Sequence, residues 1–433
     1  MLLIYSHKGA ARLLYTCSFI FKELLGIPFL LTIDSEKFKA HNGPKLSYSD
    51  AAIAAEGFHL QNHPLLFEHD VKTQAIECFT FQNHKAFFKT TEGDFPFDIF
   101  AASFYLLTRY EEYLPHEKDS YGRYACENAL AYREGFLKLP LVNIWVQYFT
   151  GSLEQKFPGL ALKQPRFTFL PTYDIDIAWS YKHKGLFRNA AGFLRSPSKE
   201  RIKVLTGRLN DPFDCYDWLR NLHKHYPVHP IYFFLVAENK GIYDKNISPE
   251  KDAMWKLVRQ HARKYKVGLH PSWQSGDNRS LLRKEKQQLE AMSDRQITAS
   301  RQHYIRFNLP EGYERLIAAG ITDDYSMGYG SINGFRASVA SSFYWYDLEK
   351  DENTILRIHP FCFMDANSFY EQRQDAEQTR VELEHYVSVC KAVNGTLITI
   401  WHNNFLAPPG EAADPAFIGW RELYENFIAQ VQQ

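Results

Sequence analysis

Two aspartates stand two residues apart where an apolar stretch of the chain gives way to polar residues. The segment PTYDID, residues 171–176, follows Phe169 and Leu170 and carries Asp174 and Asp176. In a β-strand, residues i and i+2 point to the same face, about 6 to 7 Å apart. Two carboxylates at that distance raise each other's pKa unless a cation or an arginine lies nearby. The pair therefore predicts a division of roles, with one aspartate as a metal ligand and the other as a general base.

Three histidines follow other apolar runs and provide imidazoles for the same chemistry. His270 ends the run VGLH, His303 stands two residues beyond Arg301 in SRQH, and His402 ends the run LITIWH. A catalytic zinc site needs about three protein ligands and an open position for water. Asp176, His270 and His303 would make that set, and His402 is the candidate general acid. For His270, a structural role in the core or at the surface is an equal alternative.

Alternating strands and helices must position these residues. From about residue 164, buried apolar strands end in polar clusters, and helical segments lie between several of them. The clusters are FTFLPTYDID (167–176), KVGLHPSW (266–273), ITASRQH (297–303), NGFRAS (333–338), RIHPFCFMDA (357–366) and TLITIWHNN (396–404), and HPIYFFLVA (229–237) is a further buried strand. This alternation is typical of parallel pairing, which places working residues at the C-terminal ends of strands. We therefore expect the polar side chains at these ends to meet.

The chain divides near residue 162. Residues 1–162 are predicted to form a smaller α/β domain and residues 163–433 a larger α/β domain that carries the site. The elements expected in the first domain are strands over 2–6 and 27–33, an amphipathic helix between them, and helices over 97–114 and 141–157. No glycine-rich phosphate loop follows the first strand, so nucleotide binding is not predicted.

The order of the motifs resembles that of the polysaccharide deacetylase superfamily, in its carbohydrate esterase family 4 form. The resemblance covers about residues 165–410 and runs from an Asp-pair motif, TYDID, through the strand IYFFLVA, a His motif and an Arg motif to a late strand that ends in His402. It implies that the larger domain is a distorted (β/α) barrel. The whole chain is similar to a divergent bacterial branch in which an uncharacterised α/β domain precedes that barrel.

The resemblance implies roles for individual residues. Asp174 matches the catalytic base, Asp176 the metal-binding aspartate, His270 the first histidine of the metal motif, Arg301 the arginine that orients the base, and His402 the histidine that assists the leaving group. The implied reaction is hydrolysis of an N-acetyl or related acyl group on a carbohydrate. In it, metal-bound water attacks the amide, Asp174 accepts a proton and His402 protonates the amine. The implied cofactor is a divalent metal, with Zn²⁺ as the first candidate.

Two positions depart from the common pattern of that family. Ile175 separates two aspartates that are adjacent in the usual form, and Gln274 stands where a second histidine is expected, four residues after His270. His303 is the candidate replacement. Without it, two other interpretations stay open: a metal-free hydrolase of cyclic amides or related C–N bonds, and a degenerate barrel that binds glycans or serves as a scaffold without catalysis.

Side chains near these motifs are candidates for substrate binding. They are Trp273, Arg336, Trp401 and Asn403. Aromatic faces suit a sugar ring, and an arginine suits a carboxylate or the sugar. Core packing of the tryptophans and a structural ion pair for Arg336 are open alternatives. In TRYEEY, a solvated helical face is favoured over a site role for Glu111 and Glu112.

Charge and composition narrow the classes of partner. Fifty basic residues balance fifty acidic ones and the pI is near 7.3, so nucleic acid is not predicted as a partner. Charges such as Lys8 and Arg12 interrupt the apolar N-terminal stretch, which argues against a signal peptide or a membrane span. Six cysteines without C-x-x-C spacing fit free thiols in a reducing compartment. We therefore expect a cytoplasmic protein with a carbohydrate or sugar-derived substrate, and the sequence carries no signal for an oligomeric state.

Overall fold

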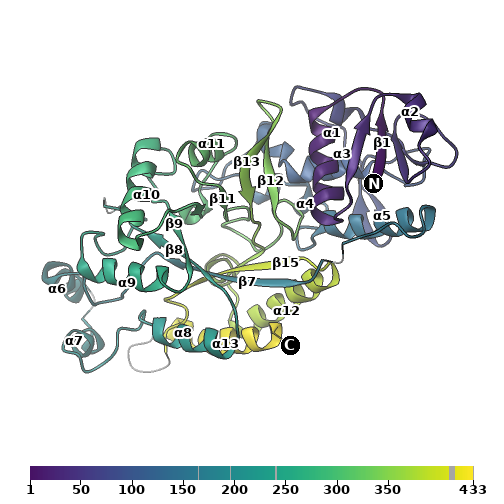
Figure 1. Cartoon of the computed structure of the whole chain (residues 1–433). Coiled ribbons are helices and arrows are strands. Elements are labelled where there is room, and N and C mark those ends of the chain that lie inside the picture. Colours follow the sequence, from purple (N-terminus) through teal and green to yellow (C-terminus); the bar gives the residue numbers. More distant parts are fainter. Residues whose placement is uncertain (164, 196, 239–240, 409–414, 433) are drawn as a thin grey trace.

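Two main β-sheets, one with strands between residues 2 and 60 and one with strands between residues 168 and 402, form the framework of the molecule (Figure 1). The residues that precede the second sheet are called the N-terminal half below. The computed structural model describes residues 1–432 except 164, 196, 239–240 and 409–414. The smaller sheet and its helices lie at one end, near the N-terminus, and the strands of the larger sheet run through the rest (Figure 1). No helix within the described residues is long and apolar enough to cross a membrane.

The smaller sheet has four parallel strands in the order β2-β1-β3-β4. They are β1 (Leu2–Ser6), β2 (Phe29–Thr32), β3 (Lys45–Tyr48) and β4 (Phe58–Leu60). The α-helices of this half are α1 (Ala11–Cys17), which continues as a π-helix over Ser18–Leu24, α2 (Ser35–Ala40), α3 (Ile99–Leu107), α4 (Leu130–Arg133) and α5 (Leu141–Lys156). Strands β5 (Phe79–Phe81) and β6 (His84–Ala86) form a hairpin. The predicted β-α-β start is confirmed, since β1 and β2 pair in parallel. The helix predicted over 97–114 is shorter, because Arg109 adopts a left-handed φ of 55° just after α3.

The larger sheet has nine strands in the order β12-β13-β11-β10-β9-β8-β7-β15-β14. They are β7 (Thr168–Ile175), β8 (Ile231–Leu235), β9 (Lys266–His270), β10 (Ala299–Ser300), β11 (Asp323–Asp324), β12 (Phe343–Asp347), β13 (Glu352–Ile358), β14 (Phe363–Met364) and β15 (Thr396–His402). Neighbours pair in parallel except β12 with β13. Strands β12 and β14 are edges, so within the described residues the sheet is open and the predicted distorted (β/α) barrel is not confirmed. The segment NGFRAS, expected at a strand end, lies in a loop.

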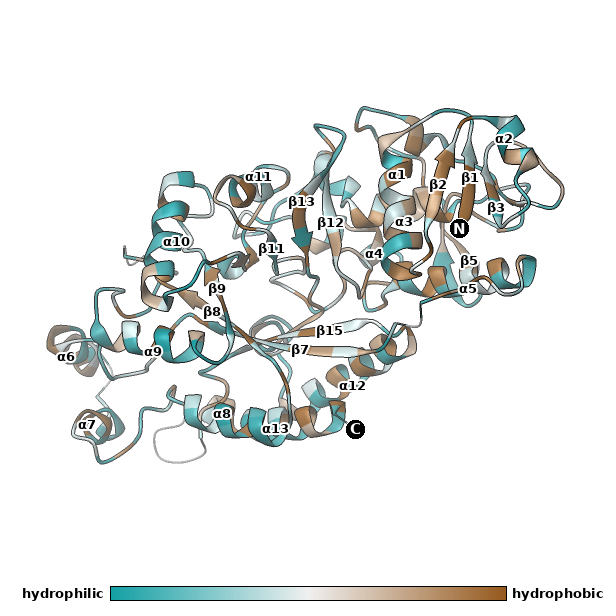
Figure 2. Cartoon of the chain, viewed as in Figure 1, coloured by the Kyte–Doolittle hydropathy of each residue, from teal (hydrophilic) through white to brown (hydrophobic). Residues whose placement is uncertain are grey.

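The α-helices of this part lie in the chain between and after the strands of the larger sheet. They are α6 (Leu186–Arg195), α7 (Lys199–Leu205), α8 (Tyr216–His225), α9 (Asp252–Ala262), α10 (Arg279–Ser293), α11 (Glu311–Ala318), α12 (Ala376–Ala392) and α13 (Trp420–Val431). Helices α9 and α10 contact β9, and α12 contacts β15. Figure 2 shows hydrophobic residues over much of β8 and β9 and hydrophilic ones over most of α10. In α10 the buried side chains Leu282, Leu289 and Met292 recur at helical spacing, so one stripe of this polar helix packs inward.

A buried ion-pair network joins the two halves of the chain. Glu112 lies 2.6 Å from Nη2 of Arg336 and 2.7 Å from Nε of Arg109. Burial alone would raise the pKa of the Glu112 carboxyl, but Arg336 and Arg109 lower it to about 2. The expectation of a solvated face was wrong, since the side chains of Glu111 and Glu112 are 7% and 2% exposed. The prediction that Arg336 binds substrate is also wrong, because its buried guanidinium is held by Glu112 and by the carbonyl of Gly328.

Candidate metal and catalytic site

Several strands of the larger sheet end at one cavity of about 750 Å³. Asp174, Asp176, His270, His303 and His402 all line it. Parallel pairing sets this arrangement: His402 on β15 stands opposite Asp174 on β7, and β8 lies between β7 and β9, which ends at His270. The expectation that polar side chains at the strand ends meet is therefore confirmed for these five residues.

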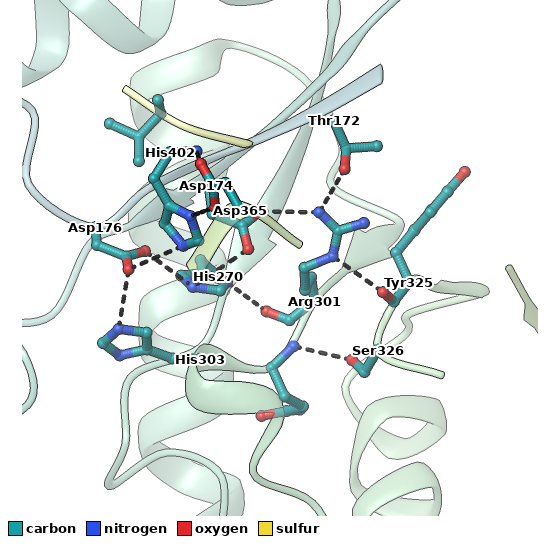
Figure 3. A network of polar contacts seen from close by, with 12 residues as sticks. Thr172, Asp174, Asp176, His270, Arg301, His303, Tyr325, Ser326, Asp365 and His402 are labelled. Carbon is teal, nitrogen blue, oxygen red and sulfur yellow. Dashed lines mark hydrogen bonds and ion pairs between the residues drawn. The ribbon is translucent and has the colours of Figure 1, made fainter. Parts of the chain in front are cut away.

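Asp176 faces three imidazoles, and two of them form a tight group with it (Figure 3). Its Oδ1 lies 3.1 Å from Nε2 of His270, and its Oδ2 lies 3.4 Å from Nε2 of His303. One donor atom from each of the three residues lies within 4.8 Å of the other two. Donors around a tetrahedral zinc stand about 3 to 3.5 Å apart, and the two distances from Asp176 fall in that range. Gln274, at the position of the missing second histidine, is exposed.

Each of the two histidines is oriented from behind through its Nδ1. Nδ1 of His270 lies 2.7 Å from the carbonyl oxygen of Arg301, and Nδ1 of His303 lies 3.0 Å from Oδ1 of Asp244. A carbonyl oxygen can only accept, so Nδ1 of His270 carries a proton and its Nε2 is the atom available to a metal. Such partners behind a ligating histidine fix its tautomer and are typical of metal sites.

An unsatisfied atom and the charges of the group also fit a cation. Among the described residues, Oδ1 of Asp176 is buried and has no hydrogen-bond partner of good geometry. Burial alone would raise the pKa of Asp176, but the imidazoles of His303 and His270 hold it well below its usual range. Burial would lower the pKa of His303, but Asp176 and Asp244 raise it to about 9. Asp176 is thus ionised at neutral pH, and a divalent cation would displace the proton on His303.

Asp174 lies beside this group and is held by Arg301. Nη1 of Arg301 donates to Oδ1 of Asp174 at 2.9 Å and to the hydroxyl of Thr172 at 2.7 Å. The guanidinium is fully buried, its Nε donates to the carbonyl of Tyr325, and its Cζ lies 4.5 Å from the ring centre of Phe233. The arginine therefore cannot turn away, and it fixes one oxygen of Asp174 while the other, Oδ2, lies 3.9 Å from Nε2 of His270.

His402 is held by an aspartate that sequence reasoning did not single out. Nδ1 of His402 lies 2.6 Å from Oδ1 of Asp365, and the backbone N–H of His402 donates to Oδ2 at 2.7 Å. Nε2 of His402 points to Asp176, with Oδ2 at 3.6 Å (Figure 3). Asp365 follows β14 in the cluster RIHPFCFMDA, so the strand-end rule that found His402 could also have found Asp365.

Two other predicted substrate-binding residues belong to the interior. Trp401 has no exposed surface and packs in the aromatic core, so the prediction that it binds substrate is wrong. Asn403 is 1% exposed, and its Nδ2 donates to the carbonyls of Ile177 and Phe213. This amide ties the loop after β7 to the loop before α8, and the prediction that it binds substrate is likewise wrong.

Trp273 lies near the cavity but not on its surface. It is half-buried and stacks on Tyr243 with 3.9 Å between ring centres, and Tyr243 lines the cavity. A direct role of Trp273 in substrate binding stays a prediction. Asp244, which orients His303, was missed because it lies in a loop well beyond the end of β8, where no periodic pattern marks it.

Comparisons with known proteins give a family for part of the chain and structures for another part. Residues 2–158 match a family of unknown function, DUF7033. No curated protein matches. Similar solved structures are a probable polysaccharide deacetylase from Pseudomonas aeruginosa PAO1 (10% identity, TM-score 0.38, 61% of this chain and 85% of that one), the polysaccharide deacetylase Bc1974 from Bacillus cereus (11%, 0.30, 61% and 89%), and a BA3943 mutant, a CE4 family pseudoenzyme with restored enzymatic activity (10%, 0.31, 62% and 63%).

These structures are of the superfamily that the motif order resembles, at low sequence identity. One of them is described as a CE4 family pseudoenzyme with restored enzymatic activity. With TM-scores below 0.5, the likeness carries no argument about activity.

Proposed function

We propose that this protein is a metal-dependent hydrolase that removes an N-acetyl or related acyl group from a carbohydrate. The observation that carries the proposal is the convergence of Asp176, His270 and His303, in which a hydrogen bond at Nδ1 orients each imidazole. Beside this group lie Asp174, which is paired with Arg301, and His402, which is paired with Asp365. A zinc ion held by these three residues would activate a water and polarise the acyl oxygen. The remaining steps fall to the side chains around it.

Asp174 is the general base. Arg301 occupies its Oδ1, so Oδ2 is the oxygen that accepts the proton of the attacking water. The water oxygen forms the new bond to the acyl carbon. A positioned base of this kind contributes about 10²- to 10⁴-fold in rate.

His402 is the general acid. Asp365 binds its Nδ1, so the proton to be given lies on Nε2, which faces the cavity. As the C–N bond breaks, Nε2 passes that proton to the departing amine nitrogen. The products are a free carboxylic acid and the amine of the sugar.

The alternatives differ from this proposal in what they need at Asp176. A metal-free hydrolase would not need His303 near that carboxylate, yet the two lie 3.4 Å apart. A scaffold without catalysis would not need Asp174, Asp176, His270 and His402 to converge, yet all four line one cavity. Both observations support the metal-dependent hydrolase.

Metal content tests the first part of the proposal. Purified protein is loaded with Zn²⁺ and dialysed, and its zinc content per chain is then measured by elemental mass spectrometry. We expect about one zinc per chain in the wild type and none in Asp176→Ala. Asp323→Ala is the matched control, because Asp323 is similarly exposed (23% against 26%) and also pairs with a histidine, His359, at 2.9 Å. Wild type without bound zinc would refute the metal-dependent form.

Acyl release tests the second part. Acetate liberated from a panel of N-acetylated oligosaccharides is measured for wild type, Asp174→Asn and Asp323→Asn. We expect kcat to fall by about 10²- to 10⁴-fold in Asp174→Asn and to stay near wild type in the control. If the zinc-loaded wild type releases no acetate from any member of the panel, the proposed activity is wrong.

A further inference from the structure

A loop from the N-terminal half reaches the candidate catalytic cavity. Tyr121 and Arg123 line this cavity together with Asp176 and His303, although they lie far before β7 in the chain. Asp119 organises the loop: its Oδ1 accepts the backbone N–H groups of Tyr121 and Arg123, each at 2.9 Å, and its Oδ2 lies 2.6 Å from Nε of Arg123. The loop is therefore an ordered part of the cavity wall, held by these hydrogen bonds.

Arg123 fastens the loop to the turn that follows His303. Its Nη1 donates to the carbonyl oxygen of Tyr304 at 2.8 Å. Tyr304 and Ile305 have left-handed φ angles of 59° and 54°, which are uncommon for residues other than glycine and strained for a β-branched one. Backbone strain of this kind clusters at functional sites. The N-terminal half thus holds in place the turn that begins at a candidate metal ligand.

Three tyrosines on the cavity surface, with a tryptophan behind them, form an aromatic wall. Tyr121, Tyr243 and Tyr304 are half-buried and line the cavity. The ring centre of Tyr304 lies 5.4 Å from that of Tyr121 and 5.2 Å from that of Tyr243, and Trp273 stacks behind Tyr243. The C–H face of a pyranose ring packs well on such rings, while its hydroxyl groups stay free for hydrogen bonds.

We propose that the N-terminal half supplies part of the substrate site, with Tyr121 forming one face of a platform for a pyranose ring of an N-acetylated oligosaccharide. The platform lies beside the metal and catalytic groups, because Tyr121 and Tyr304 share the cavity with Asp176. It would hold the ring that carries the acyl group or its neighbour in the chain of sugars. The choice of ligand class rests on the proposed function, whereas the contribution of Tyr121 rests on the geometry.

Binding of a defined probe tests this inference. The dissociation constant of N-acetylglucosamine tetrasaccharide is measured by calorimetry on the zinc-loaded full chain carrying Asp174→Asn, which slows turnover. Adding Tyr121→Ala should weaken binding roughly 5- to 10-fold. Tyr121→Phe, which keeps the ring, should restore most of the lost affinity. Tyr132→Ala, at a 42% exposed tyrosine of the same half, should leave the affinity unchanged.

Two outcomes would overturn the inference: equal affinity with and without Tyr121→Ala, or no binding of the tetrasaccharide by the parent protein. If Tyr121→Ala proves unstable in thermal unfolding, Tyr121→Leu keeps apolar bulk in the loop without the flat ring and should weaken binding similarly.

Acetate release separates this inference from the proposed function. A wild type that binds the tetrasaccharide through Tyr121 but releases no acetate would refute the activity and leave the platform intact. A wild type that releases acetate with the same KM as Tyr121→Ala would support the activity and refute the platform.

Discussion

Nδ1 of His402 lies 2.6 Å from Oδ1 of Asp365, so the terminal histidine of β15 and the aspartate after β14 act as a pair. Asp365 has no exposed surface. Burial would lower the pKa of His402, but Asp365, with Asp176 and Asp174, raises it to about 10. The imidazole is therefore protonated at neutral pH, which is the state a general acid requires.

Replacing this aspartate should remove the acid without removing the histidine. In Asp365→Asn the neutral amide no longer stabilises the imidazolium, so we expect kcat for acetate release to fall about 10²-fold or more. The measurement is kcat on a saturating N-acetylated oligosaccharide. Asp323→Asn, which also alters a histidine-bound aspartate, should keep its activity. A kcat for Asp365→Asn within threefold of wild type would show that the pair has no catalytic role.

The aspartate behind His303 should control metal affinity. Asp244 accepts from Nδ1 of His303, and loss of such a partner typically costs 10- to 100-fold in metal affinity. We therefore expect Asp244→Asn to bind zinc 10- to 100-fold more weakly, measured by competition with a chromophoric chelator. Asp323→Asn is again the control, and equal zinc affinity in Asp244→Asn and wild type would contradict the assignment of His303 as a ligand.

The ion pair between the two halves should matter for stability. Arg336→Met leaves the buried Glu112 without one of its two arginines, and breaking a buried pair typically costs about 3 to 5 kcal/mol of unfolding free energy. Arg357→Met is the control, because Arg357 is 41% exposed and lies 3.8 Å from Glu23. That change should cost less than about 1 kcal/mol. Urea denaturation gives both values, and similar losses in the two variants would argue against a special role for the buried network.

Two buried histidines should make the protein sensitive to mild acid. Burial lowers the pKa of His223 and of His261 to about 4, whereas the unfolded chain has histidine pKa values near 6.5. Between these values the unfolded state binds protons that the folded state does not, so the unfolding free energy falls as the pH falls from about 6.5 towards 4. Between pH 7 and pH 5, each histidine should lower the unfolding free energy by roughly 2 kcal/mol.

A variant that lacks one of these two histidines measures that contribution. His261→Phe keeps a ring among its aromatic neighbours and removes the titration, so its loss of stability between pH 7 and pH 5 should be smaller than in wild type. His229→Gln, at an exposed histidine, should follow the wild-type curve. Parallel curves for wild type and His261→Phe would show that this histidine does not resist protonation in the folded state.

Three of the residues that line the cavity could be placed from the sequence because they lie at or near the ends of strongly apolar strands. His270 closes β9, His402 closes β15, and Asp174 lies one residue before the end of β7. Such ends are visible in sequence because the composition changes where the strand leaves the core. Parallel pairing then brings the ends of neighbouring strands to the same edge of the sheet.

The errors also have physical causes. Trp401 precedes His402 on the same strand, and successive strand residues point to opposite faces, so a histidine facing the cavity places the tryptophan in the core. Arg336 lies in a loop, and its ion-pair partner Glu112 comes from the N-terminal half. No local sequence pattern connects the two residues. Tyr121 and Arg123 lie far before β7 in the chain, and only the tertiary fold brings them to the cavity.

The pairing of β7 with β15 also sets the order in which the site can assemble. Thr168 and Thr396, at the start of these strands, are hydrogen-bonded although they are 228 residues apart in the chain. During synthesis the first candidate catalytic residue, Asp174, therefore emerges long before its cross-strand neighbour His402. Contacts of such long range form slowly, and until they form the apolar edge of β7 is open to incorrect partners. A nascent chain that stalls before β15 would carry the candidate base without the candidate acid and would depend on chaperones to avoid aggregation.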